Sequence, residues 1–66
     1  MKGVIKNLVA ERGFGFIRAE NGTDYFFHRT GVVPRHSFDH LAEGVEVTFS
    51  VETHEKGPRA VDVVRA

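Results

Sequence analysis

Flat aromatic rings recur at every second residue in two neighbouring segments of the sequence. Phe14 and Phe16 are separated by one residue, and so are Phe26 and His28. Because alternate side chains of a β-strand point to the same face, each pair would lie on one side of its strand. Rings gathered on an exposed face can stack on other flat rings. The sequence therefore predicts a stacking surface, provided that the two segments form adjacent strands.

Short segments rich in β-branched and aromatic residues, bounded by glycine and proline, predict an all-β fold. We expect five strands, at residues 2–10, 14–18, 23–28, 45–53 and 59–64. Asn21-Gly22 is typical of a hairpin turn, which makes the second and third strands neighbours. Residues 29–44 form the long connection, in which Pro34 argues against a sustained helix. A flat sheet would leave its edges unprotected, so we expect a small antiparallel barrel.

The phase of each strand decides which side chains fill the barrel. We expect the interior to contain Ile17, Tyr25, Phe27, Val45, Val47, Phe49 and Val51. Phe14, Phe16, Phe26 and His28 then lie outside, and together they are called the aromatic platform. The opposite phase, with Phe14 and Phe16 inside and Ile17 outside, stays open, because the phase of a strand is not visible in sequence alone.

Exposed rings indicate a binding surface. Each exposed Phe forgoes about 1.5–3 kcal/mol of burial, and a contiguous apolar patch usually marks an interaction site. Single-stranded nucleic acid suits such a patch, because every base has a π-face and stacking contributes about 1–3 kcal/mol per base. Gly13 and Gly15 beside the rings would let a strand approach the backbone closely.

Composition excludes several other classes of protein. The chain has 66 residues, which predicts one domain, and nine Lys and Arg balance nine Asp and Glu, so nucleic acid is not held by bulk charge alone. The absence of cysteine excludes disulfides and thiolate metal sites. Without a leader or an apolar run long enough for a membrane, we expect a cytoplasmic protein with no membrane partner.

Segments of the sequence resemble the bacterial cold-shock domain family. Residues 12–17, Arg-Gly-Phe-Gly-Phe-Ile, fit the start of the RNP1 consensus, and residues 24–28, Asp-Tyr-Phe-Phe-His, are similar to RNP2. Similar blocks at residues 1–3, 41–49 and 56–60 extend the resemblance over the whole chain, residues 1–66. The resemblance implies a five-stranded antiparallel OB-type barrel. It also implies binding of single-stranded RNA and DNA, mostly pyrimidine-rich, and an RNA-chaperone role that affects transcription or translation.

The resemblance also implies roles for individual residues. Base stacking would fall to Phe14, Phe16, Phe26, His28 and Phe38. Contacts to the nucleic-acid backbone or to base edges would fall to Lys6, Arg12, Asp24, Lys56 and Arg59. No cofactor or ATP is implied.

Two departures from the family pattern remove rings. The family usually has Trp-Phe-Asn after Lys6, where this chain has Asn7-Leu8-Val9, and it usually has Phe after His28, where this chain has Arg29. Losing two stacking surfaces would cost about 2–6 kcal/mol of base stacking. Arg29 would recover part of this, because a guanidinium plane stacks on bases and adds charge. We therefore expect weaker binding with a larger electrostatic share.

Other functions have less support in the sequence. His36 and His40, with Asp39 between them, suggest a metal, but this spacing suits a helix that Pro34 makes doubtful, so we expect no metal site. No catalytic triad, phosphate loop or pair of carboxylates indicates an enzyme. The alternative is a protein-interaction or dimerisation module that uses the same rings. We expect a monomer, while pairing of an exposed strand edge leaves a dimer open.

Overall fold

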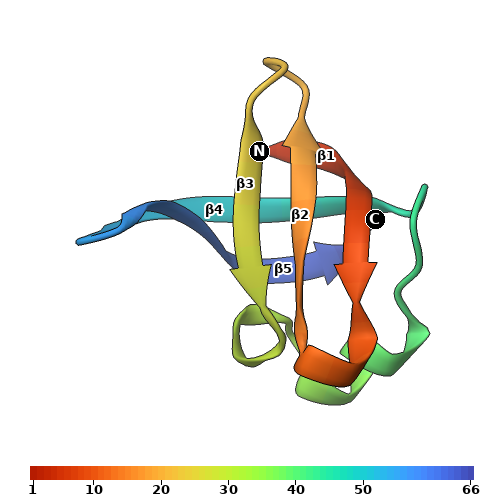
Figure 1. Ribbon diagram of the computed structural model, residues 1–66. Helices are drawn as coiled ribbons and strands as arrows, with labels where there is room; N and C mark the ends of the chain where they lie inside the picture. The colour runs from red at the N-terminus through yellow and green to blue at the C-terminus, as the bar shows by residue number, and fades with distance from the viewer.

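The computed structural model describes residues 1–66 as five β-strands and three short 3-10 helices (Figure 1). In chain order they are β1 (Lys2–Val9), η1 (Ala10–Arg12), β2 (Phe14–Ala19), β3 (Asp24–His28), η2 (Arg29–Gly31), η3 (Arg35–His40), β4 (Glu46–His54) and β5 (Gly57–Arg65). The five predicted strands are confirmed, with small changes at their ends. Each helix is too short to cross a membrane.

The strands close into a barrel in the order β1-β2-β3-β5-β4. Four of the pairings are antiparallel, but β3 and β5 meet in parallel at Phe26 and Arg59. The prediction of a purely antiparallel barrel is therefore wrong at this contact. A closed ring with an odd number of strands cannot alternate in direction throughout, so one of its pairings must be parallel.

A tight turn and a β-bulge position the residues on the outer face of the β2–β3 hairpin. The turn places Gly22 at a φ of 84°, and Thr23 donates its backbone N–H to Oδ1 of Asn21 over 2.9 Å. The register between β1 and β2 shifts between Ile5 and Asn7. Lys6 and Asn7 are consequently both exposed although they are consecutive, and Asn7 lies opposite Phe16.

The barrel interior holds one hydrophobic core. It consists of Ile5, Ile17, Ala19, Tyr25, Phe27, Val32, Phe38, Leu41, Val47, Phe49, Ala60 and Val63. Val45 is partly buried against this core. At Gly15, an added Cβ would lie 2.5 Å from the carbonyl oxygen of Asn7 and 2.8 Å from Cε1 of Phe27. Glycine at this position therefore lets the Phe27 ring fill the barrel directly beneath β2.

The prediction that Val51 belongs to the core is wrong. Its side chain is 41% exposed, and every residue of β4 from Ser50 onward is exposed. The register between β4 and β5 shifts between Thr48 and Ser50, and beyond this point the two strands extend from the barrel as a hairpin (Figure 1). Both faces of β4 meet solvent beyond this point, so its alternation no longer separates a buried face from an exposed one.

Candidate nucleic-acid interface

The aromatic platform lies on the outer face of the β2–β3 hairpin. Phe14 pairs with His28, and Phe16 pairs with Phe26, across the two strands. Phe14, Phe26 and His28 are half-buried, and Phe16 is 37% exposed. Ile17 is fully buried on the opposite face. The predicted phase of these strands is therefore confirmed, and the alternative with Phe14 and Phe16 in the core is wrong.

Phe26 is the central ring of the platform. Its centroid lies 5.7 Å from that of Phe14, with the rings tilted by 35°, and 5.8 Å from that of Phe16, with the rings near edge-on at 70°. The guanidinium carbon of Arg59 lies 5.3 Å from the Phe26 centroid. These separations are typical of aromatic pairs and of a cation–π contact. The rings and the guanidinium therefore support one another as a continuous surface.

A carboxylate held by two cations borders one end of the platform. Oδ1 of Asp24 accepts a hydrogen bond from Nε of Arg18 over 3.0 Å, and Oδ2 accepts one from Nζ of Lys6 over 2.8 Å. Hydrogen bonding to Arg18, and then to Lys6, lowers the pKa of Asp24 to about 2. The same contact raises the pKa of Arg18. This end therefore presents two cations around one ionised carboxylate.

The other end of the platform is formed by His28 and Arg29. The backbone N–H of Thr30 donates to Nδ1 of His28 over 3.2 Å, an arrangement that leaves Nε2 as the ring nitrogen able to donate to a ligand. The backbone N–H of Arg29 donates to the carbonyl oxygen of Gly13 over 2.8 Å. A Cβ on Gly13 would lie 2.9 Å from Cδ of Arg29. The Arg29 side chain thus packs across Gly13, next to Phe14.

The remaining predicted residues lie in three different places. Arg12 is exposed at the end of η1, one residue before the turn into β2. Lys56 is exposed in the turn of the β4–β5 hairpin, which extends away from the barrel (Figure 1). Phe38 is 4% exposed and lies in the core, with its ring centroid 6.2 Å from that of Phe27. The expectation that Phe38 stacks on a base is corrected, because η3 turns this ring into the barrel.

Two residues without an assigned binding role join the interface. Arg18 continues the alternation of Phe14 and Phe16, so the sequence predicts that it lies on the same face of β2. Its pairing with Asp24 depends on the register between β2 and β3. Asn7 reaches the interface through the bulge in β1. A shallow hollow of about 290 Å³ lies beside it, lined by Lys6, Asn7, Phe16 and Asp24.

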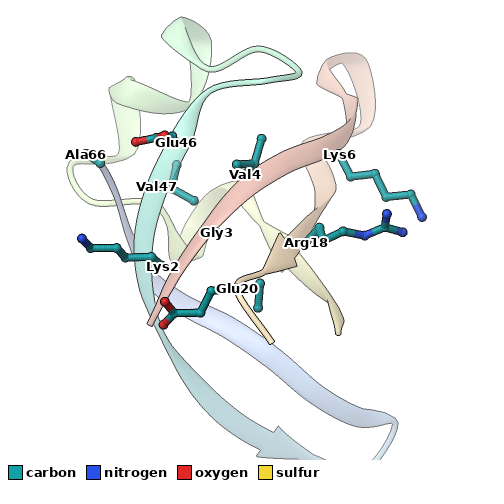
Figure 2. A pocket seen from close by; sticks show the side chains of 10 residues that line it. Lys2, Gly3, Val4, Lys6, Arg18, Glu20, Glu46, Val47 and Ala66 are labelled. Carbon is teal, nitrogen blue, oxygen red and sulfur yellow. The ribbon is translucent and has the colours of Figure 1, made fainter. Parts of the chain in front are cut away.

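The largest hollow of the molecule, about 620 Å³, lies over the outer side of β1 (Figure 2). Val4, which is 40% exposed, is in register with Arg18 on β2 and with Glu46 on β4. Figure 2 shows Lys6 and Arg18 together on one side of this trough and Lys2 and Glu46 on the other. Its charges are mixed and it contains no ring, so it lacks the chemistry of the platform.

Comparison with known proteins identifies close relatives. The sequence profile of the 'Cold-shock' DNA-binding domain matches residues 1–66. A major cold shock protein of Streptococcus pyogenes serotype M1 is 42% identical over 64 residues, covering 97% of this chain and 94% of the relative. Cold shock-like protein CspE of Bacillus anthracis is 42% identical and covers 98% and 96% of the two chains. Cold shock protein CspC of Bacillus subtilis is 42% identical and covers 98% and 97%.

Proposed function

The chain belongs to the cold-shock DNA-binding domain family. From this premise we propose that residues 1–66 act as one domain that binds single-stranded nucleic acid on the aromatic platform. Single-stranded nucleic-acid binding with a chaperone role is the function that this membership supports. Bases stack on Phe14, Phe16 and Phe26, and His28 adds a ring with a hydrogen-bond donor. The observation that carries the proposal is a set of partly exposed rings, packed around Phe26, on one face of a hairpin.

Cations around the platform supply the electrostatic part of binding. We assign contacts with phosphates to Lys6, Arg12, Arg29, Lys56 and Arg59. Asp24 keeps Lys6 and Arg18 extended beside Phe16 and can accept a hydrogen bond from a base edge. We further propose that RNA is the main partner, that pyrimidine-rich strands are favoured and that a cytoplasmic monomer is the active form.

The chaperone role follows from mass action. A protein that binds unpaired strands and not duplexes shifts the equilibrium of a hairpin toward its open form, by an amount set by protein concentration and affinity. This step needs no cofactor. Members of the family that carry aromatic rings at the positions of Asn7 and Arg29 have two more stacking surfaces. Because this chain lacks those rings, it binds more weakly, and charge supplies a larger share of its binding free energy.

Fluorescence anisotropy with a labelled single-stranded pyrimidine heptamer tests the proposal. We expect saturable binding that weakens steeply as salt rises, because displaced counterions return to the free strand. Phe14→Ala is expected to lower the affinity at least tenfold without unfolding the protein. Wild-type affinity in the folded variant would remove the platform from the mechanism. Binding of a protein instead, with little dependence on salt, would favour the interaction module.

A further inference from the structure

A third hollow, smaller than the two described above, opens beside the His28 end of the platform. It has a volume of about 190 Å³ and lies between the end of β3, η2 and the β4–β5 hairpin. His28 and Arg59 line this hollow, and both also belong to the surface around Phe26. A nucleotide of a strand bound on the platform can therefore enter the hollow without leaving the protein surface.

The β4–β5 wall of the hollow carries hydrogen-bond acceptors. Glu52 and Asp62 both line it, and Oε1 of Glu52 lies 2.8 Å from Nε2 of His54, which leaves Oε2 available to a ligand. Asp62 adopts a φ of 52°, uncommon for a residue other than glycine. Two carboxylates repel a phosphate, so the part of a nucleotide suited to this wall is a base that donates hydrogen bonds.

The volume of the hollow and its remaining lining residues indicate which bases it can hold. With a volume of about 190 Å³, the hollow has room for several waters or for one pyrimidine ring. Val33 and Val61 supply apolar walls for the ring. His28 and Arg59 also line the hollow and supply donors, and Arg59 is the registered partner of Glu52 across β4 and β5. An occupant that carries an amino group beside a ring-nitrogen or carbonyl acceptor would therefore match the neighbouring Glu52 and Arg59.

We propose that this hollow is a subsite for one cytosine of the bound strand, an inference that rests on the proposed function. The N4 amino group of cytosine donates to Glu52, in the way that carboxylates commonly recognise this base. The O2 and N3 acceptors of cytosine then face the donors of His28 and Arg59. Uracil presents the O4 carbonyl where cytosine presents its amino group, so Glu52 repels it.

Anisotropy with cytidine and uridine heptamers tests the subsite, because uniform strands fill it in any binding register. We expect Glu52→Gln to lower the ratio of cytidine to uridine affinity about tenfold, since an amide can donate to O4 of uracil as readily as it accepts from N4. Glu55→Gln is the matched control: it changes charge equally in the turn of the same hairpin, outside the hollow. Both positions are exposed, and thermal unfolding verifies the fold of each variant.

Each outcome of this experiment is decisive. A ratio that falls in Glu52→Gln and not in Glu55→Gln supports the cytosine subsite. Equal ratios in the wild type and in both variants overturn the subsite and leave binding by the platform intact. Failure of the wild type to bind either heptamer overturns the proposed function together with the subsite.

Discussion

The guanidinium carbon of Arg59 lies 5.3 Å from the centroid of the Phe26 ring, and these two residues form the registered pair between β3 and β5. This pairing is the parallel contact that closes the barrel. Closure of the fold thus brings a cation from the end of the chain onto the central ring of the platform. The hairpin alone, residues 14–28, would have the rings without this charge.

Arg59 is expected to contribute both charge and a flat surface. Arg59→Gln should weaken binding of a pyrimidine heptamer and make the plot of log affinity against log salt shallower by about 0.7, the value for one phosphate contact on a single strand. Arg59→Lys should keep the salt slope while losing affinity, because an ammonium group has no plane to stack. Anisotropy at several salt concentrations measures both quantities. An unchanged slope in Arg59→Gln would mean that Arg59 contacts no phosphate.

Phe16 is the most exposed platform ring and is expected to bind by stacking and not by apolar contact alone. Phe16→Leu keeps an apolar side chain but removes the π-face, so affinity for the heptamer should fall about tenfold. The thermal midpoint should change little, because the side chain is exposed. Val51→Ala, an apolar truncation outside the platform, is the control and should bind normally. Wild-type affinity in Phe16→Leu would contradict the stacking role.

The platform was predictable because the information for it is local. The period of two in β2 and β3 puts Phe14 and Phe16 on one face, and the buried set formed by Ile17, Tyr25 and Phe27 fixes the other. The turn at Asn21-Gly22 makes these strands neighbours. The resemblance to a family pointed to the same rings independently.

Phe38 and Val51 show what such local information omits. Phe38 lies in a connection without periodicity, and only packing against Phe27 shows that its ring completes the core. Val51 continues a regular alternation, but β4 has left the barrel at this point. The Arg18–Asp24 pair depends on strand register, and the 5.3 Å contact of Arg59 with Phe26 depends on barrel closure. These are tertiary features that no local pattern contains.

The carboxyl group of Asp24 is expected to titrate far below the usual range. Its pKa is about 2, because Arg18 and Lys6 hydrogen-bond the charged form, against about 3.9 for an unperturbed Asp. A depressed pKa in the folded state contributes stability above the unfolded pKa, and this contribution is lost as pH falls from about 4 to about 2. Carboxyl chemical shifts followed by NMR measure the midpoint. A midpoint near 4 would mean that the two ion pairs do not persist in solution.

The variant Asp24→Asn separates the effect of this carboxyl group on stability from the effects of the other carboxylates. Asp24→Asn should flatten the dependence of stability on pH between about 4 and 2 and leave it unchanged above pH 5. Because Asp24 stays ionised there, it should add no pH dependence to nucleic-acid binding between pH 5 and 8.

Gly15 and Gly22 are expected to tolerate alanine to different degrees. A Cβ at Gly15 would collide with the Asn7 backbone and with the Phe27 ring, so Gly15→Ala should cost about 1–3 kcal/mol or more of unfolding free energy. Gly22 has no heavy atom within 4 Å of a new Cβ, and Gly22→Ala should cost only the strain of its positive φ, about 1–2 kcal/mol. Urea unfolding of both variants compares the costs. A smaller loss at Gly15 than at Gly22 would show that β2 can move away from the core.

Asn7 is the position at which the interface can be strengthened. It is exposed and lies opposite Phe16 in the register of β1 with β2, so Asn7→Trp would place a new ring at the edge of the platform. Stacking of one more base contributes about 1–3 kcal/mol, and affinity for the heptamer should rise at least fivefold.

Val64→Trp adds the same ring at an exposed site on β5, opposite Thr48 and outside the platform, and should leave affinity unchanged. Since the chain has no other Trp, quenching of its fluorescence by the heptamer reports the contact directly. Equal quenching and equal affinity gains in both variants would show that any added ring promotes binding, and that the strand is not confined to the β2–β3 face.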